Sequence, residues 1–348
     1  MQNTVKKINN GGRLGYDEAR AYFEGILAGA MTPVQIAAGL IAMKTRGETV
    51  DELAALVAVL NAHKRPFDAL GAETIDTCGT GGDGKSTVNI STAVSVICAS
   101  MGCAVVKHGN TAQSGAVGSA DVLAELGLDV SYADTSAGEF FKRHGYVFLM
   151  APLYHPALKG IGPIRRELGV PTIINFAAPL ANPAEPSYQI IGISRRDRLD
   201  FYARAVERVG RSGVTVYASR DCYDEVSSKD ATDCIYVGEG GMRRFTIEPS
   251  DFFTPFDMPV ARNREEARKL FLAGLSGEDE QIGNLFALNA ALALRTMGRY
   301  GIKDGFHEAK RHIIEGTALR KLCAITGREA FDRRSSRVAA DSQQAAER

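Results

Sequence analysis

The sequence predicts an α/β protein in which a small all-helical domain accompanies a large α/β domain with a mostly parallel central sheet flanked by helices. Two observations lead to this prediction. Up to about residue 70, apolar residues recur at helical spacing and no strand-like segment occurs. From Thr74 onward, short apolar runs alternate with helical segments, which is typical of a parallel sheet covered by helices on both faces.

The first domain, predicted over residues 1–70, consists of helices. Thr49 is the expected N-cap of one of them. Thr32 is the expected N-cap of another, because Pro33 follows it at the first helical position. Helical spacing predicts these helices over 16–27, 34–43 and 50–62.

The second domain, predicted over residues 71–332, alternates between strands and helices. A helix ending before Gly102 and another capped by Ser119 and ended by Gly127 are expected, and Ser136 begins a capping-box pattern for a third. The expected strands are TIDTC, CAVVK, YVFLM, PTIINF, YQIIGI and GVTVYA.

Helical spacing returns near the C-terminus, at 264–273, 281–297 and 305–314. These helices either stay with the α/β domain or return to the first domain. Residues 333–348 are small and polar, so we expect a polar tail there.

The composition argues against a general attraction to polyanions. Lys plus Arg number 41 and Asp plus Glu number 41, so neither nucleic acid nor an anionic membrane attracts the chain as a whole. The six cysteines are scattered without a C-x-x-C pair, unlike a zinc site or a disulfide framework. No apolar run reaches the roughly 18 residues of a membrane span, and no apolar signal-peptide core occurs at the N-terminus. We therefore expect a cytoplasmic protein.

The stretch CGTGGDGKST satisfies the P-loop pattern G-x-x-x-x-G-K-[ST]. Three features argue against a nucleoside triphosphatase. The next helix is expected to start after Asn89 and not at Lys85, Asp83 places a carboxylate inside the phosphate cradle, and no strand candidate ends in the aspartate that would hold magnesium. A glycine-rich turn from a strand into a helix still favours phosphate binding through backbone N–H groups.

Several motifs together resemble the anthranilate phosphoribosyltransferase family. They are GTGGD, NIST, KHGN, GSADVLAELG, APLYHPAL, IRRELG, APLANP, the pair Asp224-Glu225 and Asn289-Ala290-Ala291, in the family's order over residues 10–325. The resemblance implies magnesium-dependent transfer of phosphoribosyl from 5-phosphoribosyl-1-pyrophosphate to anthranilate, in tryptophan biosynthesis, by a homodimer. It also implies the two-domain fold predicted above.

The resemblance also implies roles for individual residues. No general base is expected, because the aromatic amine is already a nucleophile. The implied magnesium ligands are Ser91, Asp224 and Glu225. The implied acceptor contacts are Asn110, His155, Arg165 and Ala178, with the arginine pairing with the anthranilate carboxylate. The implied donor shell is Gly79, Thr80, Gly81, Gly82, Asp83, Thr87, Asn89, Ser91, Thr92 and Lys107.

The chain departs from the family pattern at two places. After KHGN, Thr111, Gly115 and Ala116 replace an arginine, a serine and a lysine, so two cations are missing and weaker donor binding is expected. Ala178 stands where the family has glycine. Two alternatives therefore stay open: a transferase or phosphorylase of the same fold with another aromatic or nucleobase acceptor, and a weakly active homologue that binds nucleic acid.

Overall fold

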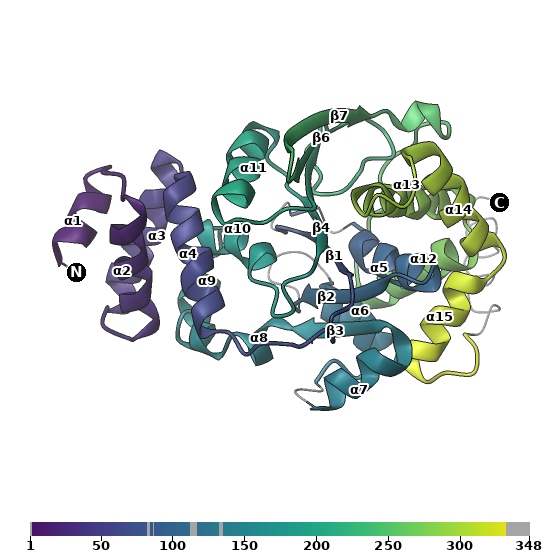
Figure 1. The fold of residues 1–348 in the computed structure, drawn as a ribbon, viewed down its shortest axis with the longest axis horizontal. Coiled ribbons are helices and arrows are strands. Elements are labelled where there is room, and N and C mark those ends of the chain that lie inside the picture. The colour runs from purple at the N-terminus through teal and green to yellow at the C-terminus, as the bar shows by residue number, and fades with distance from the viewer. Residues whose placement is uncertain (1, 82–83, 86, 112–116, 132–134, 332–348) are drawn as a thin grey trace, which may run out of the picture.

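The computed structural model describes residues 2–81, 84–85, 87–111, 117–131 and 135–331. A bundle of four N-terminal helices lies at one end of the molecule and the α/β part fills the rest (Figure 1). The predicted polar tail, 333–348, lies outside the described residues. Within the described ranges, no helix is long and apolar enough to cross a bilayer.

The N-terminal bundle has the predicted helices and caps. Thr32 Oγ1 accepts a hydrogen bond from the Gln35 backbone N–H at 3.3 Å, and Thr49 Oγ1 accepts one from that of Glu52 at 3.2 Å. Each is therefore an N-cap, as predicted. The helices are α1 (Gln2–Asn9), α2 (Tyr16–Leu27), α3 (Pro33–Arg46) and α4 (Val50–His63).

A seven-stranded sheet with the order β3-β2-β1-β4-β5-β6-β7 forms the centre of the α/β part. The first five strands in the sequence are parallel and confirm the prediction, whereas β6 and β7 form an antiparallel edge that was not predicted. The strands are β1 (Thr74–Gly79), β2 (Ala104–Gly109), β3 (Tyr146–Met150), β4 (Tyr188–Gly192), β5 (Val214–Ser219), β6 (Thr232–Gly238) and β7 (Gly241–Ile247).

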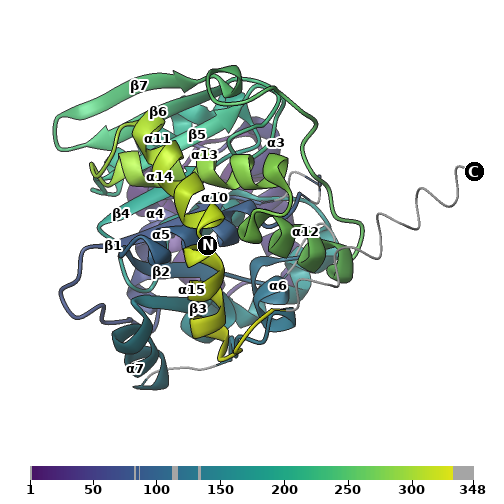
Figure 2. The same cartoon turned by 90° about the vertical axis from the view of Figure 1, so that its right-hand side faces the viewer.

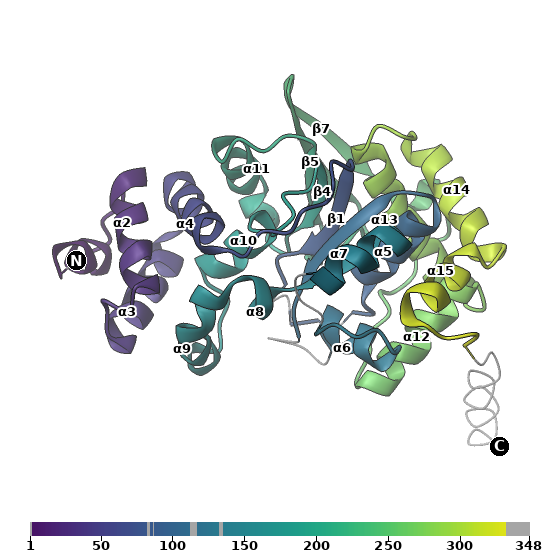
Figure 3. The ribbon, with the colours of Figure 1, turned by 60° about the horizontal axis from the view of Figure 1, so that its bottom comes forward.

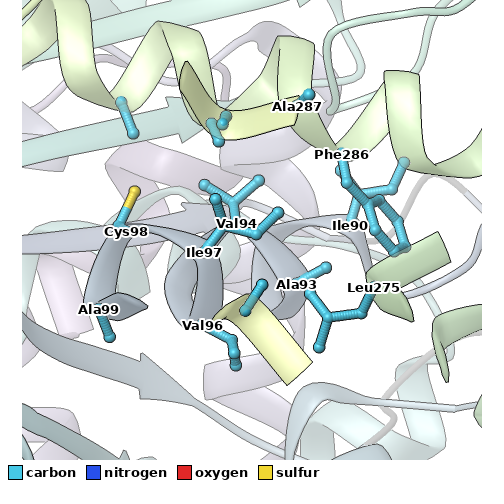
Figure 4. Packing of buried hydrophobic residues seen from close by; sticks show 14 of the residues in the cluster. Ile90, Ala93, Val94, Val96, Ile97, Cys98, Ala99, Leu275, Phe286 and Ala287 are labelled. Carbon is cyan, nitrogen blue, oxygen red and sulfur yellow. The ribbon is translucent and has the colours of Figure 1, made fainter. Parts of the chain in front are cut away.

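Helices cover both faces of the sheet (Figure 3). On one face, α5 packs against α13 and α12, where Val94, Ile97, Leu275 and Phe286 interdigitate (Figure 4). The C-terminal helices gather on this face and do not return to the N-terminal bundle (Figure 2). They are α12 (Arg264–Ser276), α13 (Glu280–Thr296), α14 (Ile302–Ile314) and α15 (Thr317–Thr326), and α5 is Ile90–Ser100.

The opposite face packs against α11, and α4 and α10 belong to the same hydrophobic core. Neighbouring residues of β4 point to opposite cores, Ile190 toward α5 and Ile191 toward α11, as the two-residue period of a strand requires. The remaining helices are α6 (Ser119–Glu125), α7 (Thr135–His144), α8 (Ala151–Tyr154), α9 (Gly162–Leu168), α10 (Ile173–Leu180) and α11 (Leu199–Arg208), with short 3-10 turns at Pro156–Gly160, Arg196–Arg198 and Pro249–Asp251.

Three local predictions were wrong. PTIINF is not a strand, because its residues enter α10, where the Thr172 backbone N–H donates to Asn175 Oδ1 at 3.1 Å in the first turn. Ser119 is the first residue of α6 and Gly118 is its N-cap. Ser136 lies inside α7, so it does not cap that helix. In the first case, a short apolar run does not distinguish a buried helix from a strand.

The crossovers place a switch point between β1 and β4. The chain leaves β1 through α5 on one face and leaves β4 through α11 on the other. Ligands of open α/β sheets bind at such a point, outside the carboxyl ends of the strands.

Candidate active site

A cavity of about 850 Å³ opens at the carboxyl ends of β1 and β2, beside the switch point. Its walls come from the loops after those strands, from α9 and α10, and from the loop after β5. The charged residues that line it are Arg65, Lys107, Lys159, Arg165, Arg166, Asp224 and Glu225. Among the described residues of the wall, five cations against two carboxylates favour anionic ligands.

The glycine-rich loop after β1 is tied to the neighbouring strand and to the acidic pair. The Thr80 N–H donates to the Gly192 carbonyl at 2.9 Å, and the Gly81 N–H donates to Asp224 Oδ2 at 2.9 Å. Of the implied donor shell, the residues that line the cavity are Gly79, Thr80, Gly81, Thr87, Asn89, Ser91 and Lys107. Gly82 and Asp83 lie outside the described residues.

Thr92 does not reach the cavity. Its side chain is fully buried in α5, and it is absent from the residues that line the cavity wall. The structure therefore gives no support to Thr92 as a donor contact.

Lys85, the lysine of the P-loop pattern, turns away from the cavity. Its Nζ donates to the Asp221 carbonyl at 2.5 Å and lies 3.7 Å from the centre of the Tyr223 ring. The following helix begins at Ile90, with Asn89 as its N-cap, and not at the lysine. Both features separate this loop from a P-loop, as the sequence indicated.

Lys107 is a buried cation at the end of β2. It is 1% exposed, and its Nζ donates to the Thr77 carbonyl at 2.5 Å and to Ser91 Oγ at 3.3 Å. Burial lowers the pKa of Lys107, and the nearby carboxylate of Asp76 opposes this shift. A desolvated ammonium on the cavity wall binds an anion more strongly than an exposed one does.

Asp76 is a supporting residue that the sequence did not reveal. It is fully buried in β1, where Asn182 Nδ2 and Gln189 Nε2 donate to its Oδ2 at 2.8 and 3.0 Å, and the His108 N–H donates to its Oδ1 at 3.2 Å. In the sequence it appeared only as one residue of a strand. Its partners come from three separate segments, so only the fold shows the network.

Asp224 and Glu225 form the acidic side of the cavity, each 8% exposed. Two glycines make room for them: a Cβ on Gly79 would overlap Asp224 Oδ2, and a Cβ on Gly192 would overlap the Asp224 carbonyl oxygen. Among the described residues no group of three or more His, Cys, Asp or Glu gathers as a metal site. Two carboxylates and the Ser91 hydroxyl nevertheless fit Mg²⁺, which takes its other oxygens from substrate phosphates and water.

The implied acceptor residues also line the cavity: Asn110, His155, Arg165 and Ala178. The guanidinium of Arg165, on α9, has no hydrogen-bond or ion-pair partner among the described residues, and burial lowers the pKa of Arg165. His155 lies between α8 and the Pro156–Gly160 turn, and its Nε2 is 2.8 Å from the Ala181 carbonyl oxygen. An unpaired guanidinium in a cavity that an imidazole also lines suits an aromatic carboxylate.

His108 is a wall residue that the role assignment missed. It lines the cavity with its ring 5.3 Å from that of His155, and its buried Nε2 has no partner among the described residues. Burial lowers the pKa of His108 to about 3 and that of His155 to about 4, so both rings are neutral at pH 7. The sequence could have indicated this residue, because His108 is the second residue of the KHGN motif.

The altered loop after KHGN is only partly described. Thr111 is exposed and lines the cavity, which agrees with a contact between this loop and a ligand. Gly115 and Ala116 lie outside the described residues.

Comparison with known proteins agrees with this geometry. Residues 71–319 match the a/b domain of a glycosyl transferase family, and residues 2–64 match its helical bundle domain. The anthranilate phosphoribosyltransferase of Pyrobaculum arsenaticum is 41% identical over 323 residues, which cover 91% of this chain and 96% of the relative. That of Geobacillus kaustophilus is 38% identical over 335 residues, covering 94% and 98%.

Solved structures give the same result. The anthranilate phosphoribosyltransferase of Thermus thermophilus has a TM-score of 0.83 at 32% identity, covering 93% of this chain and 98% of that one. The enzyme of Saccharomyces cerevisiae in complex with PRPP and Mg has a TM-score of 0.84 at 23% identity, covering 94% and 96%, and this likeness shows the fold alone. The family models and the relatives extend over nearly all of the sequence, and the chain therefore belongs to the anthranilate phosphoribosyltransferase family.

Proposed function

We propose that this chain transfers the 5-phosphoribosyl group from 5-phosphoribosyl-1-pyrophosphate to anthranilate, releasing pyrophosphate. One observation carries the proposal: a single cavity is lined by Lys107, by the acidic pair Asp224 and Glu225, and by the guanidinium of Arg165. Lys107 and the acidic pair fit a polyphosphate with its magnesium, and Arg165 fits an aromatic carboxylate. Relatives named anthranilate phosphoribosyltransferase, which are 37–41% identical to this chain, support the same reaction.

The reaction needs positioning more than acid–base chemistry. A bond forms between the anthranilate nitrogen and the anomeric carbon, the bond from that carbon to the pyrophosphate oxygen breaks, and the nitrogen loses one proton. Arg165 orients the acceptor through its carboxylate, and neutral His108 and His155 line the wall around it. Because both histidines resist protonation, neither is a strong general base, and water takes the proton.

The leaving group carries the developing negative charge. Lys107 stabilises that charge, whereas the Thr80 and Gly81 N–H groups already donate to Gly192 and Asp224. Bound Mg²⁺ supplies further neutralisation of the pyrophosphate oxygens. Asp224, Glu225 and Ser91 would hold the ion, and their carboxylate and hydroxyl oxygens are the hard ligands it prefers.

We also propose a cytoplasmic homodimer, with the helical domain at 1–70 and the α/β domain at 71–332. The six free cysteines, one of them exposed at Cys222, are consistent with a reducing compartment. Val34 is 78% exposed on α3, a surface apolar group available for self-association. Sedimentation velocity tests the dimer, and a monomer at micromolar concentration would contradict it.

An assay of anthranilate fluorescence tests the reaction. Signal loss should require 5-phosphoribosyl-1-pyrophosphate and Mg²⁺, and chelation by EDTA should stop it. Asp224→Ala with Glu225→Ala should abolish transfer while circular dichroism stays unchanged. If uracil or another nucleobase is consumed and anthranilate is not, the acceptor assignment is wrong although the donor site stands.

A further inference from the structure

Asn289 is a buried polar residue on α13, a helix that does not line the cavity. It is 1% exposed, and its neighbours Leu288 and Ala290 are fully buried apolar residues. Buried amides are almost always hydrogen-bonded, so the partners of this side chain explain why it lies in an apolar helix.

The Asn289 side chain pairs with both backbone groups of Val226. Its Oδ1 accepts from the Val226 N–H at 2.9 Å, and its Nδ2 donates to the Val226 carbonyl at 3.0 Å. The second Nδ2 hydrogen bond goes to the Leu285 carbonyl, 2.9 Å away in the same helix. Two bonds to one residue fix both the position and the rotation of that backbone, as a neighbouring strand would.

Val226 directly follows the acidic pair. The loop around the pair is also held from within its own segment: the Tyr223 N–H donates to Ser219 Oγ at 2.8 Å, and the Ser227 N–H donates to Thr232 Oγ1 at 3.2 Å. Asn289 adds a contact from a helix 63 residues further along the chain. The loop is thereby attached to α13, in which 14 of 17 residues are buried.

We propose that Asn289 is a positioning residue for the metal-binding carboxylates of Asp224 and Glu225. The inference rests on the proposed function, since it takes these carboxylates as the magnesium ligands. An apolar side chain of similar size leaves the N–H and C=O of Val226 unpaired in a dry environment. The loop then shifts toward other hydrogen-bond partners and moves the carboxylates with it.

Two asparagine-to-leucine variants on the same helix test this role. Asn289→Leu removes the contact, and Asn284→Leu is the matched control, because Asn284 is 8% exposed and its Oδ1 has no partner among the described residues. Electron paramagnetic resonance measures Mn²⁺ affinity in the presence of 5-phosphoribosyl-1-pyrophosphate. We expect Asn289→Leu to weaken Mn²⁺ binding about 10- to 100-fold, and Asn284→Leu to leave it unchanged.

Steady-state kinetics should show the same difference between the Asn289 and Asn284 variants. Excess Mg²⁺ should restore kcat in Asn289→Leu, because the ligands are still present, while the Mg²⁺ concentration for half-maximal rate rises. Asn289→Ser keeps one hydrogen-bonding group and should give an intermediate Mn²⁺ affinity. This variant also tests the proposal if Asn289→Leu does not fold.

The experiment distinguishes a failure of the positioning role from a failure of the proposed function. Equal Mn²⁺ affinity in folded Asn289 and Asn284 variants, with only the melting temperature changed, would overturn the positioning role. Wild-type protein that binds Mn²⁺ with the donor but leaves anthranilate untouched would overturn the acceptor and not this inference.

Discussion

At the scale of single residues, two lysines 22 positions apart have opposite relations to the cavity: Lys107 lies on its wall and Lys85 points to the loop after β5. We expect Lys107→Met to lower kcat/KM for the donor roughly 10- to 150-fold, since a hydrogen bond to a charged group contributes about 1.5–3 kcal/mol. Lys85→Met should stay within a few-fold of wild type. Steady-state kinetics in both variants measure the contrast, and ATP hydrolysis that disappears in Lys85→Met would restore the P-loop interpretation.

The two buried histidines predict loss of stability in mild acid. Their folded-state pKa values, about 3 for His108 and about 4 for His155, lie below the ordinary value of 6.5. Between pH 6.5 and about 4 the unfolded chain therefore takes up protons that the folded chain does not, and stability falls as the pH falls. Each histidine accounts for roughly 2 kcal/mol between pH 7 and pH 5.

Urea unfolding at pH 7 and pH 5 measures this effect. In His155→Phe the difference between the two pH values should shrink by about 2 kcal/mol relative to wild type. Because the free energy of unfolding at pH 7 and at pH 5 is compared within each protein, the pH-independent loss of the Ala181 contact in His155→Phe cancels. An unchanged difference would mean that His155 titrates normally in the folded protein.

At the scale of elements, the loop after β2 predicts how the donor is held. Thr111 lies on the cavity wall where the family has arginine. Thr111→Arg, alone and with Ala116→Lys, should lower the donor KM several-fold through charge-assisted contacts. The gain should shrink at high salt, because Thr111 is exposed. Thr111→Gln is the uncharged control, and a donor KM equal in all variants would mean that the loop does not contact the donor.

Elements were predictable where period, length and caps agreed. Thr32 and Thr49 begin their helices because each combines a capping hydroxyl with a helical pattern behind it. The run PTIINF fits either state locally, and only packing of α10 against α4 decides it. The edge strand β7 escaped prediction because its apolar residues are sparse, with Arg243 and Arg244 exposed. The neighbouring strand β6 has the apolar run CIYV and was overlooked.

At the scale of the whole molecule, a buried ion pair joins the N-terminal bundle to the α/β part. Arg198 Nη2 lies 2.9 Å from Glu48 Oε2, with side chains 15% and 5% exposed. We expect Glu48→Gln to destabilise the protein by about 3 kcal/mol, because it removes the carboxylate partner of a largely buried cation.

A second pair between the same two parts is the control. Arg208 and Asp51 are 3.1 Å apart but 48% and 46% exposed, so Asp51→Asn should cost less than about 1 kcal/mol. Denaturant unfolding of both variants measures the contrast. Equal losses would show that burial of the Glu48 pair has no energetic consequence.

Some residues of the candidate site could be predicted from the sequence, and others are revealed only by the fold. The glycine-rich loop and the acidic pair follow strands, and Lys107 lies near the carboxyl end of β2, so their place near the cavity could be predicted from order along the chain. Asp76 and Asn289 act on the site from inside β1 and α13. Apart from the Leu285 carbonyl, which Asn289 contacts within α13, their partners lie 32 or more residues away, and local sequence patterns carry no sign of such contacts.

Gly192 has a consequence for the mutational tolerance of the protein. It carries no functional group, yet the Asp224 carbonyl occupies the space where its side chain would be. Gly192→Ala would therefore displace the carboxylates of Asp224 and Glu225, with an effect as large as that of substituting either acid. In a complete substitution scan, Gly192 should therefore group with the metal ligands, whereas Gly160, which has open space around its Cβ position, should tolerate alanine. Gly192 thus contributes to the acidic part of the cavity through the side chain that it lacks, because this leaves room for the Asp224 carbonyl.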